Sequence, residues 1–115
     1  MKTNGMVIWV LFISICLMQT AAAAEFEGAG IQLCSDFNHL LKEDQLAASN
    51  FYFNWAEGFM SGLNIARLND ETAFKSMTAE EQEAQIQRYC YTHPTDQYFK
   101  GVIDLYTTLY PKIKH

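Results

Sequence analysis

The first 24 residues constrain this chain most, because they decide how much of it folds and in which compartment. Lys2 precedes an apolar segment, residues 6–18, and four alanines, residues 21–24, complete the pattern. A positive start, a short apolar segment and a small-residue cleavage site are typical of a secretory signal peptide. The apolar segment is shorter than the roughly 20 residues that a membrane span requires. We therefore expect residues 1–24 to be removed and residues 25–115 to fold as an exported, periplasmic domain.

A lipoprotein anchored through Cys16 is the alternative reading of this N-terminus. Residues 13–15 read Ile-Ser-Ile, which places a bulky side chain where lipid attachment prefers a small one. This mismatch favours soluble export over a lipid anchor.

The expected mature chain keeps two cysteines, Cys34 and Cys90, separated by 56 positions. In an oxidising compartment, an even pair of cysteines in a small domain is expected to form a disulfide. Neither cysteine has a C-x-x-C or histidine pattern that would indicate a metal site instead. Closing so long a loop stabilises a fold by roughly 4 kcal/mol in the chain-entropy description. That contribution matters because so short a chain buries only a small core.

The charge of the expected mature chain is acidic. Without Lys2, seven Lys and Arg residues face thirteen Asp and Glu residues, which leaves a net charge of −6 with His neutral. Such a balance argues against binding to nucleic acid and against binding to anionic membrane surfaces. The remaining candidate partners are proteins, including a second copy of this chain.

Apolar residues recur at three- and four-residue steps, and no segment alternates long enough for a strand, so the sequence predicts an all-α bundle of about four helices. Thr78 and Glu81 form a capping box at the start of the third helix. Pro94 ends that helix, Thr95 is the expected N-cap of the fourth, and Pro111 closes it. The predicted helices span residues 31–42, 47–68, 79–91 and 95–110.

Some finer expectations concern the ends and faces of these helices. Residues 25–30, which contain two glycines, are expected to be a flexible lead-in. Residues 69–72 are expected to form a turn after the second helix. The buried stripe of the fourth helix is expected to consist of Phe99, Val102, Ile103, Tyr106, Leu109 and Tyr110.

The second helix carries two features of its own. Phe51, Trp55 and Phe59 recur at four-residue steps and predict one aromatic face. Gly58 and Gly62 also lie four residues apart, and each glycine weakens a helix by about 1 kcal/mol relative to alanine. We therefore expect Gly58 and Gly62 to allow a neighbouring helix to pack closely.

Catalytic patterns are weak in this sequence. Ser61 lies between Gly58 and Gly62, but the spacing differs from G-x-S-x-G and the segment is predicted to be helical. His39, His93 and His115 are scattered without ligand spacing. Acidic residues at the start of the third helix are favourable to the helix dipole. The sequence therefore predicts a binding protein without catalytic residues, metal or cofactor.

Three segments resemble the HdeA/HdeB-type periplasmic acid-stress chaperones. They are residues 34–37 (Cys-Ser-Asp-Phe), residues 55–64 in the following helix, and Cys90 together with Phe99 and the closing helix. The resemblance spans almost the whole expected mature chain. It implies an HdeA-like helical fold and a protein that partly unfolds at low pH to bind unfolding clients. We expect Phe51, Trp55 and Phe59 to form the client-binding surface.

The same features are also similar to Rap1a/Tai-type immunity proteins, which are small exported helical proteins with a disulfide. This second resemblance implies an inhibitor of an exported peptidoglycan-cleaving toxin. A chaperone is expected to bind many clients in acid, whereas an inhibitor is expected to bind one partner tightly while folded.

Overall fold

The computed structural model describes residues 27–68 and 74–111. The predicted signal peptide and the predicted turn at residues 69–72 lie outside these residues, so both stay predictions. The described part of the chain is all-α, and a disulfide joins Cys34 to Cys90, so both of these predictions are confirmed. The elements are η2 (Gly28–Ile31), α2 (Cys34–Glu43), α3 (Gln45–Ala48), η3 (Ser49–Phe53), α4 (Asn54–Ala66), α5 (Ala79–Thr92) and α6 (Tyr98–Leu109).

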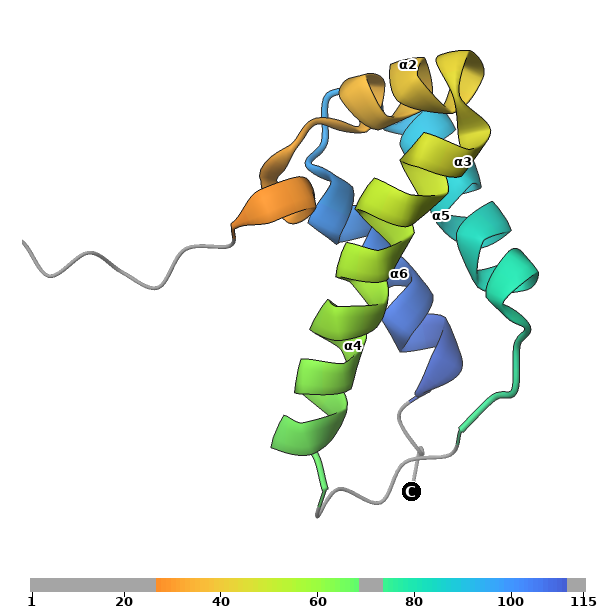
Figure 1. Ribbon diagram of the computed structural model, residues 1–115. Coiled ribbons are helices and arrows are strands. Elements are labelled where there is room, and N and C mark those ends of the chain that lie inside the picture. The colour runs from red at the N-terminus through yellow and green to blue at the C-terminus, as the bar shows by residue number, and fades with distance from the viewer. Residues whose placement is uncertain (1–26, 69–73, 112–115) are drawn as a thin grey trace, which may run out of the picture.

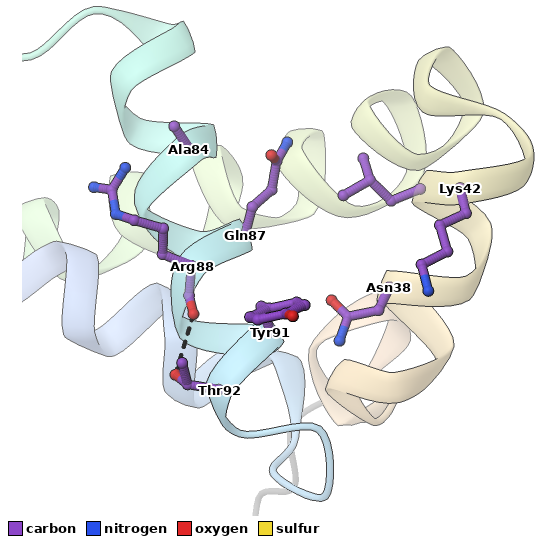
Figure 2. Close-up of a pocket in the computed structure, with 8 residues that line it drawn as sticks. Asn38, Lys42, Ala84, Gln87, Arg88, Tyr91 and Thr92 are labelled. Atoms are coloured by element: carbon purple, nitrogen blue, oxygen red, sulfur yellow. Dashed lines mark hydrogen bonds between the residues drawn. The ribbon is translucent and has the colours of Figure 1, made fainter.

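The helices pack around α6, which lies between α4 and α5 (Figure 1). The elements α3, η3 and α4 follow one another as one long helical segment, and α2 lies across one end of the bundle (Figure 1). A groove of about 640 Å³ runs between α2 and α5 (Figure 2). The central position of α6 explains why it contributes more buried residues than any other described element.

Tyr98, at the start of α6, is the centre of the aromatic core. Its ring centroid lies 5.0 Å from that of Phe37 and 4.8 Å from that of Tyr52, so the ring joins α2, η3 and α6. Burial raises the pKa of Tyr98 far above its ordinary value, because the phenolate cannot be solvated there.

The predicted buried stripe of α6 is partly wrong. Val102, Tyr106 and Leu109 are buried as expected. Ile103 is instead 37% exposed, and the fully buried positions include Tyr98 and Leu105. The helix is apolar on more than one side, and it packs on α4 and α5 at once. The buried face of α6 is therefore wider than the predicted stripe and is shifted around the helix towards Tyr98 and Leu105.

The start of α5 agrees with the prediction, whereas the start of α6 does not. The capping box is confirmed: the Thr78 N–H donates to Glu81 Oε2 at 2.8 Å, and the Glu81 N–H donates to Thr78 Oγ1 at 3.2 Å. The fourth helix begins only at Tyr98, with Gln97 and not Thr95 as its N-cap. The backbone oxygens of Pro94 and Asp96 instead accept hydrogen bonds from Ser35 and Cys34 at the start of α2, which keeps this turn out of the helix.

The segment before α2 is also more ordered than predicted. Residues 28–31 form the short 3-10 helix η2, and both Ala29 and Gly30 are buried. Gly28 has a φ of 73°, a value that glycine adopts without strain. Contact with the Trp55 ring orders this segment, which the sequence pattern alone describes as a flexible lead-in.

The second predicted helix exists, but the face that it buries differs from the predicted one. Phe51 is 54% exposed, whereas Tyr52, Phe53 and Met60 are buried. The turn formed by η3 is a π-helix, which inserts one extra residue and brings the two neighbouring aromatic residues inward.

The expectation for the two helical glycines is wrong. Gly58 and Gly62 are exposed, and a Cβ placed on either would meet no atom of the described residues within 4 Å. No neighbouring helix of the described chain approaches them, because α4 packs on α6 through the side that carries Ala56 and Met60.

Candidate functional site

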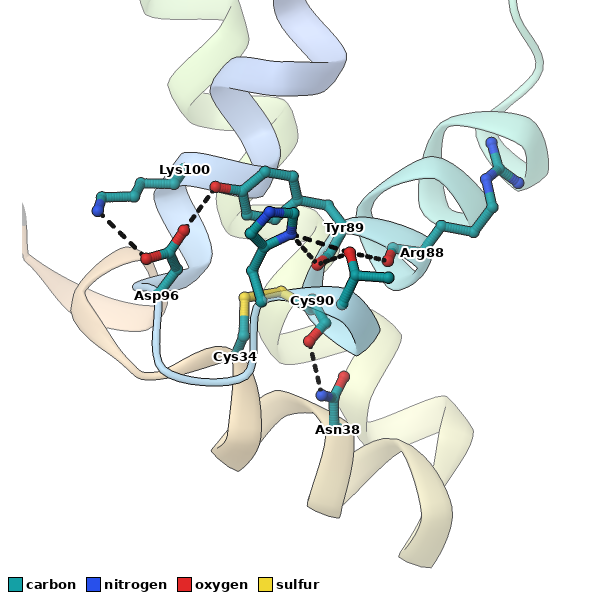
Figure 3. Close-up of a disulfide and its surroundings, with 9 residues drawn as sticks. Cys34, Asn38, Arg88, Tyr89, Cys90, Asp96 and Lys100 are labelled. Carbon is teal, nitrogen blue, oxygen red and sulfur yellow. Dashed lines mark hydrogen bonds and ion pairs between the residues drawn. A yellow bond between two sulfur atoms is a disulfide. The ribbon is translucent and has the colours of Figure 1, made fainter.

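The disulfide fastens the first turn of α2 to the last turn of α5 (Figure 3). Cys34 and Cys90 are both fully buried. Next to the bond, Asn38 Nδ2 donates a hydrogen bond of 2.9 Å to the backbone oxygen of Cys90. The covalent bond and this hydrogen bond together hold α2 and α5 in one arrangement.

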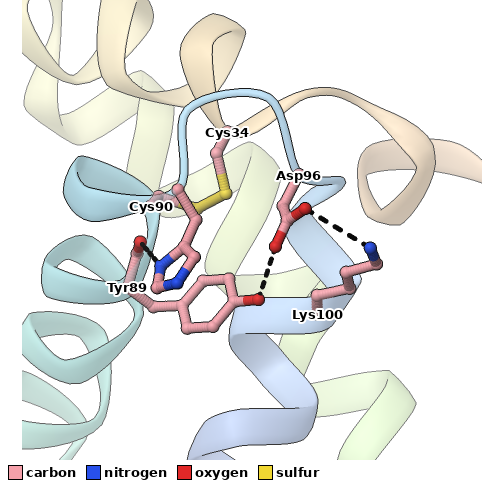
Figure 4. Close-up of polar contacts among 6 residues, drawn as sticks. Cys34, Tyr89, Cys90, Asp96 and Lys100 are labelled. Atoms are coloured by element: carbon pink, nitrogen blue, oxygen red, sulfur yellow. Dashed lines mark hydrogen bonds and ion pairs between the residues drawn. A yellow bond between two sulfur atoms is a disulfide. The ribbon is translucent and has the colours of Figure 1, made fainter.

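Asp96 lies at the centre of a polar cluster beside the disulfide (Figure 4). The Tyr89 hydroxyl donates to Asp96 Oδ2 at 2.7 Å, and Lys100 Nζ lies 3.3 Å from Asp96 Oδ1. The backbone oxygen of Asp96 accepts a hydrogen bond of 2.7 Å from the Cys34 N–H. The Asp96 side chain therefore positions a turn whose backbone holds the start of α2.

The same turn also pairs with the residues just before α2. Leu33 and Gln97 form an antiparallel bridge, and the Tyr98 N–H donates to the backbone oxygen of Gln32 at 2.8 Å. These backbone contacts attach the segment that follows η2 to the turn that contains Asp96.

The Tyr89–Asp96 hydrogen bond shifts the pKa of both groups. It is the largest cause that raises the pKa of Tyr89 to about 12, because the bond holds the phenol in its neutral form. The same bond, with a smaller contribution from Lys100, holds the pKa of Asp96 below its ordinary value, because both donors favour the carboxylate. Neutral pH therefore keeps this pair in its hydrogen-bonded state.

Trp55 and Phe59 form a stacked pair on α4. Their ring centroids lie 5.1 Å apart with an interplanar angle of 11°. Trp55 Nε1 donates a hydrogen bond of 2.8 Å to the backbone oxygen of Glu27, and the ring lies against Gly28 and Gly30. The N-terminal segment thus covers one side of a half-buried aromatic pair.

Phe51 does not belong to this pair. Its ring contacts the neighbouring Tyr52, with centroids 5.1 Å apart, and remains largely exposed. Of the three residues expected to form one aromatic surface, the structure stacks Trp55 and Phe59 and places Phe51 elsewhere on the helical segment.

The remaining polar candidates make local contacts. His39 Nε2 lies 3.3 Å from the exposed Glu43 carboxylate. His93 stacks on the Tyr89 ring, with centroids 4.3 Å apart. The Ser61 hydroxyl donates to the backbone oxygen of Glu57 within α4. His115 lies outside the described residues, and those residues contain no cluster of three or more His, Cys, Asp or Glu side chains suited to a metal ion.

The groove between α2 and α5 was not predicted from the sequence. Lys42 lines one wall, and Arg88 and Tyr91 line the other (Figure 2). The three- and four-residue spacing of Ala84, Arg88 and Tyr91 indicates a shared face of α5. Nothing local in the sequence shows that α2 lies beside that face.

Across residues 27–68 and 74–111, no helix has the length and apolar composition needed to cross a membrane. Comparison with protein-family models, curated proteins and solved structures found no match for this chain.

Proposed function

We propose that this protein is an exported acid-stress chaperone that opens at low pH and binds unfolding client proteins through Trp55 and Phe59. One observation carries the proposal: the segment that covers Trp55 is attached to the turn that contains Asp96, a titratable residue. The resemblance to the HdeA/HdeB type and the expected export through a signal peptide support the same function.

Acid acts directly on this attachment. Because the pKa of Asp96 is lower in the folded chain than in the unfolded chain, its contribution to stability is present above the ordinary carboxyl pKa. That contribution is lost as the pH falls through the folded pKa. A protonated Asp96 no longer attracts Lys100 and accepts only a weaker, neutral hydrogen bond from Tyr89. The turn and the attached segment before Cys34 are then expected to loosen.

The change in net charge at low pH also favours opening of the domain. Protonation of the carboxylates moves the charge of residues 25–115 from −6 toward +11, carried by seven Lys and Arg, three His and the amino terminus. Self-repulsion of this size loosens a small domain. The disulfide keeps α2 joined to α5, so the acid form is a partly open chain in which the Trp55–Phe59 pair is accessible.

The test compares the mature protein at neutral pH and at about pH 3, below the ordinary Asp and Glu pKa values. Trp55 is the only tryptophan of residues 25–115, so its fluorescence reports the uncovering of the pair. We expect a red shift, binding of an apolar dye and suppression of aggregation of an acid-sensitive enzyme. Asp96→Asn should open at a higher pH than the parent, and Glu57→Gln, which removes an equal charge at an exposed site, should not.

A protein that stays closed in acid, or that opens without protecting the enzyme, contradicts the chaperone proposal. Tight binding of one exported hydrolase by the closed form would then favour an inhibitor of the immunity-protein type.

A further inference from the structure

The segment that covers Trp55 contacts it through its main chain, as a bound peptide would. The segment lies beside α4 and α6 (Figure 1). The backbone oxygen of Glu27 accepts the hydrogen bond of 2.8 Å from Trp55 Nε1, and the ring lies against the backbone of Gly28 and Gly30. Residues 28–30 carry no side chain larger than a methyl group, so backbone atoms make most of this contact.

Each of these three residues is restricted to a small side chain for a reason of its own. Gly28 has a φ of 73°, where any other residue is strained. Ala29 is 2% exposed and belongs to the core, so a larger side chain there must displace packed atoms. A Cβ on Gly30 would overlap Cζ2 and Cη2 of the Trp55 ring. The surface beneath this segment therefore accepts a sequence of three small residues.

The position of the Trp55 ring does not depend on η2 alone. Phe59 stacks on the ring from α4, with centroids 5.1 Å apart. Tyr98, at the start of α6, meets it edge-on, with centroids 6.3 Å apart. These two contacts remain when η2 leaves, and Trp55 Nε1 then lacks its hydrogen-bond partner. A polypeptide that supplies a backbone oxygen at the same place restores that bond.

From these contacts we propose that the site at Trp55 selects polypeptide segments with three consecutive small residues, glycine at the first and third positions, and that residues 28–30 occupy it as an internal ligand of the closed protein. This inference rests on the proposed function, because it takes the surface that η2 leaves for the client-binding surface. Glu27 and Ile31 on either side are exposed, so the flanking positions of a client segment are free to vary. A site that bound clients through apolar area alone would instead favour bulky side chains.

The test at neutral pH uses the mature variant Gly30→Leu, whose new side chain should expel η2 from the Trp55 ring. Two capped peptides are added: one has the sequence of residues 27–32 (Glu-Gly-Ala-Gly-Ile-Gln), and the other has leucine in place of its second glycine. Neither contains tryptophan, so Trp55 fluorescence reports binding. We expect the first peptide to return the emission toward that of the parent and the leucine peptide to bind about tenfold more weakly or worse. The parent should bind neither, because its tethered segment already fills the site.

The second arm repeats the comparison with the parent at about pH 3, where the proposed function requires the site to be uncovered. The glycine peptide should then also reduce the protection of the acid-sensitive enzyme, and the leucine peptide should not. Circular dichroism checks that Gly30→Leu remains helical at neutral pH, and Gly30→Ala, with a smaller side chain, replaces it if it does not.

Two outcomes overturn the inference: neither peptide binds in either arm, or the leucine peptide binds as tightly as the glycine peptide. The failure of the proposed function looks different. A parent that stays closed in acid contradicts the chaperone proposal, and the neutral-pH arm then decides the specificity of the site by itself. A parent that protects the enzyme in acid with no preference between the peptides contradicts this inference alone.

Discussion

Gly30 shows at the scale of one residue how the N-terminal segment meets the aromatic pair. A Cβ at this position would overlap the six-membered ring of Trp55, whereas a Cβ at Gly62 would meet open space. The backbone of Gly30 has an ordinary φ, so the requirement for glycine comes from close approach and not from conformation.

Gly30→Ala should therefore destabilise the protein by about 1–3 kcal/mol, because the Trp55 ring must move away from η2. Urea unfolding measures the loss, and Trp55 fluorescence at neutral pH should shift with it. Gly62→Ala is the matched control and should stabilise the protein by about 0.5–1 kcal/mol, since alanine is the better helix former at an exposed position. A Gly30→Ala variant as stable as the parent would show that Trp55 is not held against this segment.

Tyr89 is the second residue with a distinct role, because the hydrogen bond from its hydroxyl is the largest single cause that lowers the pKa of Asp96. Tyr89→Phe should raise the pKa of Asp96 toward its ordinary value, measured by an NMR titration of the Asp96 carboxyl carbon. The stability lost in this variant should be largest above about pH 4 and should shrink in acid, where Asp96 is protonated in both proteins. In the parent, Tyr89 should also lose its contribution as the pH rises through about 12.

Tyr91→Phe is the control for this titration. Tyr91 lies two positions further along α5, is exposed and has no hydrogen bond to Asp96. Its substitution should leave the pKa of Asp96 unchanged. If the pKa of Asp96 rose equally in both variants, the Tyr89 hydroxyl would not be the cause of its low value in the parent.

At the scale of elements, the π-turn η3 and α4 decide which aromatic residues become core. Met60 is 6% exposed and packs in the core, whereas Phe51 projects largely into solvent. Met60→Ala should cost about 2–5 kcal/mol, as expected for a buried side chain. Phe51→Ala should cost at most about 1 kcal/mol. Chemical unfolding of both variants tests the assignment, and a larger loss for Phe51→Ala would place the buried face of this segment elsewhere.

At the scale of the whole molecule, the disulfide connects the first described α-helix to the fold across 56 positions. Replacing both Cys34 and Cys90 with serine should cost roughly 4 kcal/mol, mainly because the unfolded chain regains its freedom. Urea unfolding of the oxidised parent and of the double variant measures the difference. In acid the variant should also expand further than the parent in small-angle scattering, and equal dimensions would show that the disulfide does not limit the opening.

Local signals in the sequence determined which elements form and where several of them end. The capping box at Thr78 and Glu81 marks the start of α5, Pro111 lies just beyond α6, and the helical spacing throughout predicts an all-α fold. These features depend on residues a few positions apart, which a sequence places together whatever the fold. The disulfide followed from the number of cysteines and the expected compartment, and it needed no knowledge of distances.

Only the tertiary structure decided which sides of the helices are buried and what lies between them. Residues 51–66 and 98–109 are apolar on more than one side, so their periodicity permits several buried faces, and the neighbouring helices select one. The order of η2 depends on Trp55, which follows it by more than twenty positions. The groove between Lys42 and Arg88 exists because two distant helices are held side by side. Contacts of this kind depend on the packing of the whole chain, which short-range patterns do not contain.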